Sequence, residues 1–290
     1  MHGPTSHLYF SQRLRLHYVD WGNEGAPHML MIHGGRDHCR NWDWVAERLC
    51  DRYHIIAPDL RGHGDSDWST GASYNEVSYI YDIAQLVHQK QMAPVTILAH
   101  SLGGSIGLLY SGIFPETVEK IVAIEGLGAS PQMLERMNAM AIEQRMRSWI
   151  TTRREAAGRT PRKYATLEEA IARMKEENRH LNDEQAQHLT IHGAVQNEDG
   201  TWSWKFDNFV RLGGGPGGLS AADQHRLWSC ISCPVLLIRG TESWASDPVI
   251  DGRIGHFTNA RLANIERAGH WSHHDQLEMF IERVESFLAE

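Results

Sequence analysis

The sequence predicts an α/β protein: a mostly parallel, doubly wound sheet that carries an inserted helical cap. Short apolar runs alternate with helix-like stretches over the first 130 residues. A helical, charged block then interrupts this rhythm, and further apolar runs resume it near the end of the chain. The apolar runs lack in-and-out alternation, which is typical of parallel strands buried on both faces.

Four short runs in the first 130 residues are expected to be strands, namely 28–32, 54–57, 95–99 and 120–124. They are too short for helices and are bounded by Gly, Pro or Asp. The stretches between them, 41–50, 74–90 and 104–113, are interpreted as helices. Strands separated by helices in this way indicate a parallel sheet covered on both sides.

The block 131–228 is strongly helical and contains no parallel-strand segment. Strand-like runs at 235–240 and 260–266 and a final helix over 274–290 complete the core. We therefore expect a core of residues 1–130 and 229–290, with 131–228 inserted as a helical cap. The glycine-rich stretch 212–218 is interpreted as a flexible connector near the end of the cap.

Composition limits the classes of function. A chain of 290 residues can bury roughly three quarters of its unfolded surface, which is enough for a full core. The formal net charge of −8 argues against nucleic acid or anionic lipid as a partner. No basic flank precedes an apolar leader, and no apolar run approaches the length of a membrane span, so a cytoplasmic protein is expected. The oligomeric state stays open.

The four cysteines, Cys39, Cys50, Cys230 and Cys233, are too few and too scattered for a disulfide framework. The pair at 230 and 233 has no second pair with which to bind zinc. They are interpreted as ordinary thiols without a redox or metal role.

The segment 95–104, VTILAHSLGG, places Ser101 on the turn between a buried strand and a helix that opens with glycines. A nucleophile elbow has this geometry, because a sharp turn lifts the hydroxyl above the sheet and small neighbours avoid a clash. Ala99 and Gly103 are the small neighbours here. The backbone N–H of Leu102, at the start of the helix, is then directed toward an oxyanion. The alternative is a serine that only caps the helix.

An oxyanion hole needs a second donor, and Gly35 is the candidate. His33, Gly34 and Gly35 directly follow the strand-like run 28–32, where glycines let a backbone N–H approach the serine. The alternative for this stretch is an ordinary tight turn.

His270 is the candidate general base that a serine nucleophile requires. It follows the last strand-like run and precedes the last helix, on the same side as the serine turn. His273, His274 and Asp275 lie beside it, so a metal site is an alternative. We favour polar surface positions for His273 and His274 at the start of the last helix, and no metal or cofactor.

The acid that orients the imidazole is the open question. A carboxylate is usual about three residues after Gly240, but Ser243 stands there. Glu125, Glu242 and Asp247 are the candidates. Glu125 follows a buried apolar run, and a buried carboxylate needs a partner to stay ionised. The Nδ1–H of an imidazole meets that need and fixes the tautomer that accepts a proton at Nε2, which favours Glu125.

With these motifs in order, the chain resembles the α/β-hydrolase fold enzymes. The matching segments IHGG, APDLRGHGDSD, AHSLGG, VLLIRGTE and AGHW cover nearly all of the chain outside the cap. The resemblance implies that 58–67, with Asp59, Arg61, His63 and Asp65, is a structural loop near the pocket. Most of the tryptophans are expected to pack in the core and cap.

The spacing of the acid resembles that in one branch of this superfamily, which holds a group of haloalkane dehalogenases and the coelenterazine luciferases. There the glutamate follows the nucleophile by about two dozen residues, and Glu125 follows Ser101 by 24. Those dehalogenases use an aspartate nucleophile followed by tryptophan, whereas Leu102 follows a serine here. Dehalogenation and epoxide hydrolysis are therefore not expected.

The sequence thus predicts a serine hydrolase that cleaves carboxylic esters of small apolar molecules, of the carboxylesterase type. Ser101 attacks, His270 transfers the proton, Glu125 orients the imidazole, and the N–H groups of Gly35 and Leu102 hold the oxyanion. Hydrolysis of a lactone, of a thioester or of a carbon–carbon bond in a diketone would use the same residues. A small-molecule receptor on a hydrolase scaffold is the alternative outside enzymes. The substrate-binding residues are not predicted.

Overall fold

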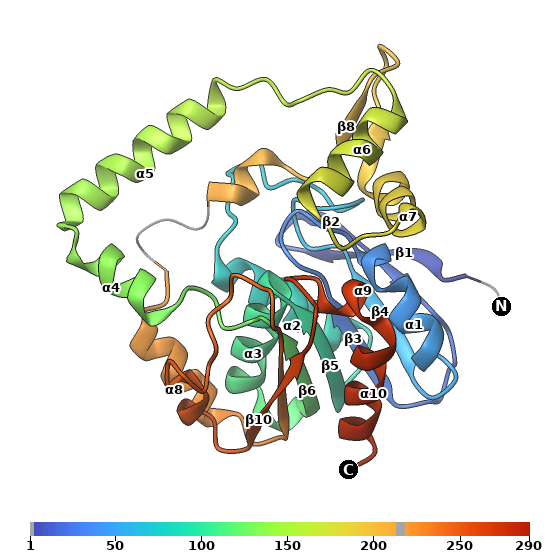
Figure 1. Cartoon of the computed structure of the whole chain (residues 1–290), viewed down its shortest axis with the longest axis vertical. Helices are drawn as coiled ribbons and strands as arrows, with labels where there is room; N and C mark the ends of the chain where they lie inside the picture. The colour runs from blue at the N-terminus through green and yellow to red at the C-terminus, as the bar shows by residue number, and fades with distance from the viewer. Residues whose placement is uncertain (1–2, 213–217) are drawn as a thin grey trace.

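An eight-stranded sheet forms the centre of the molecule in the computed structural model, which describes residues 3–212 and 218–290 (Figure 1). Its strand order is β1-β2-β4-β3-β5-β6-β9-β10. All neighbours from β4 to β10 pair in parallel, while β1 and β2 pair antiparallel with each other and β2 pairs antiparallel with β4. The parallel strands are β3 (His28–Ile32), β4 (His54–Pro58), β5 (Val95–His100), β6 (Val118–Ile124), β9 (Val235–Gly240) and β10 (Ala260–Ile265). The predicted α/β class and mostly parallel sheet are confirmed.

The hairpin of β1 (Thr5–Ser11) and β2 (Leu14–Asp20) is the part of the sheet that the sequence did not predict. Gln12 and Arg13 form its turn, both with positive φ, at 48° and 67°. Hairpin turns of this kind usually carry Asn or Gly, so the turn has no sequence signal. β1 is also an edge strand, and its apolar residues Leu8 and Phe10 are exposed. Apolar residues in β1 therefore do not mark the buried face of the strand.

Helices cover both faces of the sheet. α2 (Glu76–Gln89), α3 (Leu102–Ile113) and α8 (Ala221–Cys230) pack on one face, and α1 (Asp43–Leu49) and α10 (Leu277–Leu288) pack on the other. Successive side chains of a strand point to opposite faces. In β3, Leu30 and Ile32 therefore join the first cluster, while Met29 and Met31 join the second. Burial on both faces explains the continuous apolar runs.

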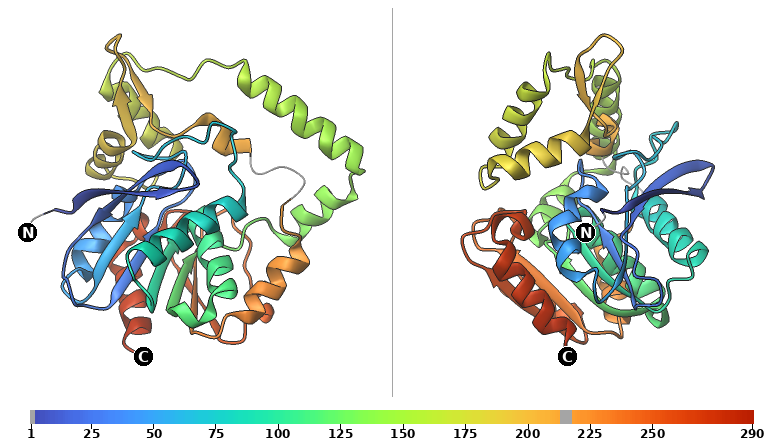
Figure 2. Two further views of the ribbon diagram at one scale, coloured as in Figure 1. Left: turned by 180° about the vertical axis from the view of Figure 1, so that it is seen from behind. Right: turned by 90° about the vertical axis from the view of Figure 1, so that its right-hand side faces the viewer.

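The inserted segment lies over the end of the sheet from which Ser101 emerges (Figures 1 and 2). Its elements are α4 (Pro131–Ala139), α5 (Ile142–Ala157), α6 (Leu167–Glu177), α7 (Asp183–Gly193), the antiparallel strands β7 (Ala194–Gln196) and β8 (Trp202–Trp204), and the short helix η3 (Asn208–Leu212). α5 buries no residue and extends away from the core. Within the described residues, no helix combines the length and apolar character that a membrane crossing requires.

The segment predicted as the cap, 131–228, ends in a helix that packs on the core. A Cβ atom at Gly112 of α3 would lie 2.2 Å from the carbonyl oxygen of Leu227 of α8, so the two backbones are in close contact. Trp228 is buried in the same cluster as the side chains of α3. Most of the glycine-rich connector, 213–217, lies outside the described residues.

The four cysteines are free thiols. Burial raises the pKa of the Cys39 thiol well above its usual value and that of Cys233 to about 11. Both thiols are therefore protonated near neutral pH, the form in which a thiol is a poor nucleophile and metal ligand.

Candidate active site

Ser101 lies on the turn between β5 and α3 in a conformation that few non-glycine residues adopt, with φ +52° and ψ −115°. Its backbone N–H donates to the carbonyl oxygen of Ile124 at 2.8 Å, which ties the turn to β6. A Cβ atom at Gly103 would lie 2.4 Å from the carbonyl oxygen of Ile32, so a glycine is required there. Close backbone packing therefore maintains the strained turn.

Three side chains from distant parts of the chain meet beside this turn. The Oγ of Ser101 lies 2.9 Å from Nε2 of His270, and Nδ1 of His270 is hydrogen-bonded to Oε2 of Glu125. The hydroxyl of Ser243 donates to the same carboxylate oxygen at 2.6 Å, and the N–H of Gly240 donates to Oε1 at 3.0 Å. Because the Glu125 side chain is completely buried, these donors are what stabilise its charge.

Glu125 itself sits at the carboxyl end of β6 with φ +49°, a second left-handed non-glycine residue in the site. Its N–H donates to the carbonyl oxygen of Ile238 in β9 at 2.9 Å. The ends of two neighbouring strands therefore fix the direction of the carboxylate.

The two alternative acids lie elsewhere. Glu242 is half exposed, and its carboxylate faces His180 at 3.6 Å. Asp247 accepts backbone hydrogen bonds from Val249 and Ile250, at 2.8 and 3.3 Å, and so closes a local turn. Neither forms a hydrogen bond or ion pair with His270 in the described residues.

Gly35 and Leu102 lie next to each other, as an oxyanion hole requires. A Cβ atom at Gly35 would be 3.9 Å from Cδ2 of Leu102. The N–H of Leu102 belongs to the first turn of α3, where N–H groups have no partner within the helix. Among the described residues the N–H of Gly35 donates no hydrogen bond. Both donors are therefore available to a bound oxygen.

His100 is a supporting residue that the sequence did not reveal. Its Nε2 lies 2.9 Å from the carbonyl oxygen of His270. Burial and the nearby His270 ring lower the pKa of His100 well below its usual value, so its ring is neutral. A neutral ring whose Nε2 carries the proton donates to that carbonyl and holds the backbone of the candidate base.

The expectation that His273 and His274 are surface residues is wrong. Both are buried in α9 (Ser272–Asp275), a short helix separate from α10. The ring of His273 stacks on Trp42, and that of His274 packs edge-on against Trp44. Aromatic packing therefore explains their burial, which lowers the pKa of His274 to about 3.

Two groups of side chains have metal-ligand types within reach of one another: His17, Cys39 and Asp59, and Asp43, His188 and His192. Both carboxylate oxygens of Asp59 already have partners, since Oδ1 accepts from the N–H of Cys39 and Oδ2 accepts from the N–H of Asp65 and lies 2.7 Å from Nδ1 of His17. In the second group, Asp43 forms an ion pair with Arg40 at 2.6 Å, so the positive charge next to this carboxylate is already that of an arginine. Hydrogen bonds and ion pairs within the chain account for both groups.

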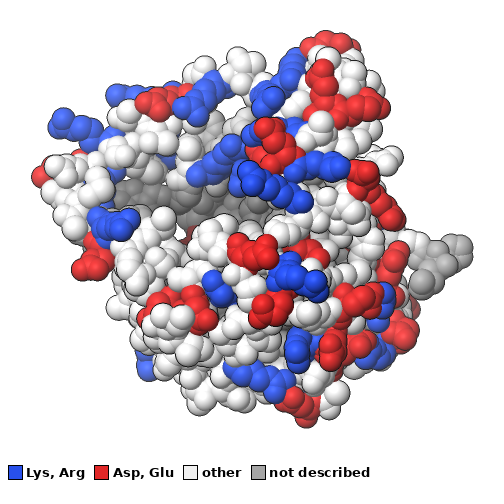
Figure 3. Space-filling model, viewed as in Figure 1, with Lys and Arg blue, Asp and Glu red and all other residues white. Residues whose placement is uncertain are grey.

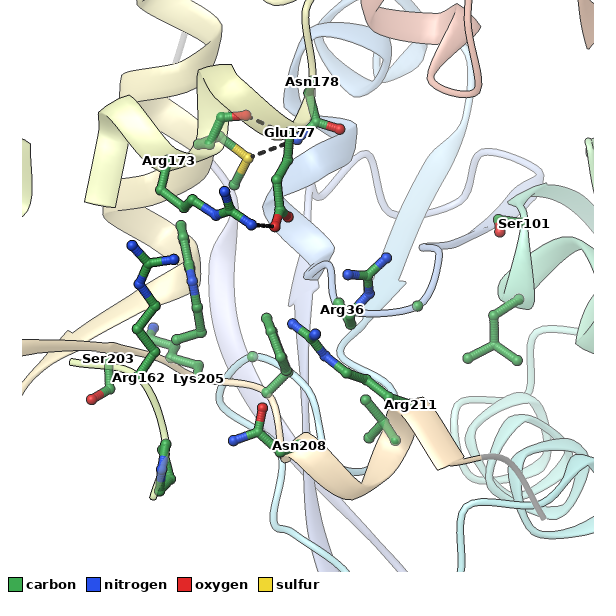
Figure 4. A pocket seen from close by; sticks show the side chains of 18 of the residues that line it. Arg36, Ser101, Arg162, Arg173, Glu177, Asn178, Ser203, Lys205, Asn208 and Arg211 are labelled. Carbon is green, nitrogen blue, oxygen red and sulfur yellow. Dashed lines mark hydrogen bonds and ion pairs between the residues drawn. The ribbon is translucent and has the colours of Figure 1, made fainter. Parts of the chain in front are cut away.

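A cavity of about 1380 Å³ lies between the core and the inserted segment and reaches Ser101 and His270 (Figures 3 and 4). Its volume exceeds the roughly 300–1,000 Å³ that is usual for a small-molecule pocket. Trp244, absent from the predicted site, is 77% exposed and lies over the His270 ring, with 4.9 Å between the ring centroids. An exposed indole beside the candidate base offers a contact surface for a ligand.

Residues 29–283 match the profile described as the alpha/beta hydrolase family. The chain is 25% identical to a serine hydrolase-like protein of Dictyostelium discoideum over 93% of this chain and 77% of that protein. It is 24% identical to an esterase of Mycobacterium tuberculosis over 99% and 91% of the two chains. A thioesterase domain from the curacin biosynthetic pathway superposes with a TM-score of 0.82 at 21% identity, covering 98% and 99% of the chains.

Proposed function

Because the chain belongs to the alpha/beta hydrolase family, we propose that it is a serine hydrolase that cleaves carboxylic esters through an acyl-enzyme. The observation that carries the proposal is the series of contacts from Ser101 through His270 to Glu125, with 2.9 Å between Oγ and Nε2. The family's esterase and serine hydrolase-like relatives support the same reaction type.

In the proposed reaction the Ser101 oxygen attacks the ester carbonyl while Nε2 of His270 takes the hydroxyl proton. The new imidazolium is stabilised by the buried carboxylate of Glu125 at Nδ1. The N–H groups of Gly35 and Leu102 donate to the oxyanion. His270 then returns the proton to the leaving alkoxide, and the alcohol departs. Water attacks the acyl-enzyme by the same steps, which releases the acid and restores the serine.

The test is turnover of short-chain p-nitrophenyl esters by the wild type and by Ser101→Ala. The variant should lose essentially all turnover above the uncatalysed rate of the buffer. Ser105→Ala, one helical turn further along α3, is the matched control and should retain wild-type turnover. Equal turnover by the wild type and Ser101→Ala would end the proposal.

A diketone assay and a binding measurement, run beside the ester assay, distinguish the alternatives. Turnover of a diketone but of no ester would favour the carbon–carbon hydrolase. Tight ligand binding by the wild type without turnover would favour the receptor.

A further inference from the structure

The charge of the cavity wall is opposite to that of the whole chain. Eight of the described residues that line it are Lys or Arg and three are Asp or Glu. The chain as a whole has 28 Lys and Arg against 36 Asp and Glu. Lys and Arg side chains gather along the edge of the hollow between the core and the inserted segment (Figure 3). The excess of cations is therefore local to this cavity.

Half of the lining cations already have acidic partners. Arg173 pairs with Glu176 and Glu177, Lys163 with Asp199, Lys205 with Asp65, and Arg159 with Glu155. The other four are Arg36, Arg162, Arg179 and Arg211. Within the described residues none of these four forms an ion pair.

Arg36 and Arg211 are two of these unpaired arginines, and their guanidinium groups lie near each other. They come from separate parts of the chain, the loop after β3 and the short helix η3. Figure 4 shows both guanidinium groups directed into the same space of the cavity. Burial and the positive charge of Arg36 lower the pKa of Arg211 more than the nearby carboxylate of Glu177, which is paired with Arg173, raises it. An anion bound between the two groups would relieve this repulsion and accept hydrogen bonds from both forks.

The position of Arg36 connects this space to the candidate reaction centre. Arg36 directly follows Gly35, the candidate oxyanion donor, and has φ +65°, which is uncommon for a residue with a side chain. Ser101, Arg36 and Arg173 of the inserted segment all line the same cavity, and in the projection of Figure 4 Arg36 lies between the other two. A molecule whose carbonyl is at Ser101 can therefore extend past Arg36 into the cationic part of the cavity.

We infer that the natural substrate carries a carboxylate or phosphate, which Arg36 and Arg211 bind while the scissile carbonyl lies at Ser101. The inference rests on the proposed function and adds a substrate class to it. It also departs from the small apolar substrates that the sequence predicts. The large cavity fits this class, since the substrate must span the distance from the serine to the arginines.

The test compares matched substrates that differ only in the anion. In the first pair the anion is on the acyl side: mono-p-nitrophenyl adipate carries a carboxylate, and its methyl ester is the neutral partner. In the second pair the anion is on the leaving side: S-acetyl-4′-phosphopantetheine carries a phosphate, and S-acetylpantetheine is the neutral partner. In at least one pair the anionic member should have a kcat/KM about tenfold higher or more, the factor expected for one charge-assisted hydrogen bond.

Variants assign this preference to particular side chains. Arg36→Gln and Arg211→Gln should each lower the ratio of anionic to neutral kcat/KM toward one, and Arg36→Lys should keep part of it. Using the ratio cancels any general effect on the nearby oxyanion loop. Arg283→Gln, which removes one positive charge from the exposed surface of α10, is the control and should leave the ratio unchanged.

Binding to Ser101→Ala separates the two proposals. Monomethyl adipate or 4′-phosphopantetheine should bind to this variant in calorimetry, and the affinity should fall when Arg211→Gln is added. If neutral esters are hydrolysed in a Ser101-dependent way but both ratios are near one, the inference is wrong and the proposed function stands. If no ester is hydrolysed but the anion still binds through Arg211, the function fails and the anion site stands. Absence of both binding and preference overturns the inference.

Discussion

Replacing Glu125 with Gln should slow ester hydrolysis by about 10⁴ in kcat, the loss known for the equivalent change in a serine triad. In the variant Oε1 still accepts from the Gly240 N–H, but an amide NH₂ replaces the oxygen that faces His270 and Ser243. The imidazole must then accept at Nδ1 and carry its proton on Nε2. That tautomer cannot take the proton of Ser101. The loss corresponds to about 5 kcal/mol of transition-state stabilisation.

Steady-state kinetics with p-nitrophenyl butyrate would measure this loss, with KM expected to change little because Glu125 is buried behind the imidazole. Glu242→Gln is the matched control, since it removes the same charge from a half-exposed side chain near the site. It should stay within about threefold of the wild type. Near-normal kcat in Glu125→Gln, or a larger loss in Glu242→Gln, would refute the reasoning.

Three further predictions concern the Ser243 hydroxyl, the buried Asp82–Arg61 ion pair and the buried ring of His274. Adding Ser243→Asp to Glu125→Gln should raise kcat at least about tenfold above that of Glu125→Gln alone. The Ser243 hydroxyl lies 2.6 Å from the Glu125 oxygen that contacts the imidazole, so a carboxylate at 243 can replace that oxygen. No recovery would contradict this geometry. Asp82→Asn should lower the free energy of unfolding by about 3–5 kcal/mol in urea titrations, because it leaves the buried guanidinium of Arg61 unpaired; a loss below about 1 kcal/mol would contradict it. Burial lowers the pKa of His274 to about 3, so its stabilisation is present above about pH 6.5 and is lost as the pH falls toward 3. The loss should be about 1.4 kcal/mol per pH unit, and His274→Met should flatten the pH dependence by about one proton.

The sequence predicted the parallel part of the sheet well because burial on both faces leaves continuous apolar runs between turn residues. The same logic located Ser101, since a strand, a serine and a glycine pair are local in the chain. The β1–β2 hairpin was missed because Gln12 and Arg13 occupy a turn without turn residues. The hairpin therefore has no turn signal in its sequence. It is held in the sheet by the antiparallel pairing of β2 with β4.

Long-range packing was the part of the site that sequence patterns could not supply. His273 and His274 look polar, yet aromatic neighbours from residues 42 and 44 bury them. Ser243 occupies the usual place of the acid in the sequence, and only the structure shows that its hydroxyl donates a hydrogen bond to Glu125. The proximity of Arg36 and Arg211 depends on how the inserted segment folds over the core, and no local pattern encodes that.

The most direct test of the account is to trap the nucleophile with a fluorophosphonate and to locate the adduct by peptide mass analysis. The account predicts a single, stoichiometric adduct on Ser101, formed much more slowly in the His270→Ala variant. An adduct on another serine, or none on the active wild-type protein, would contradict it.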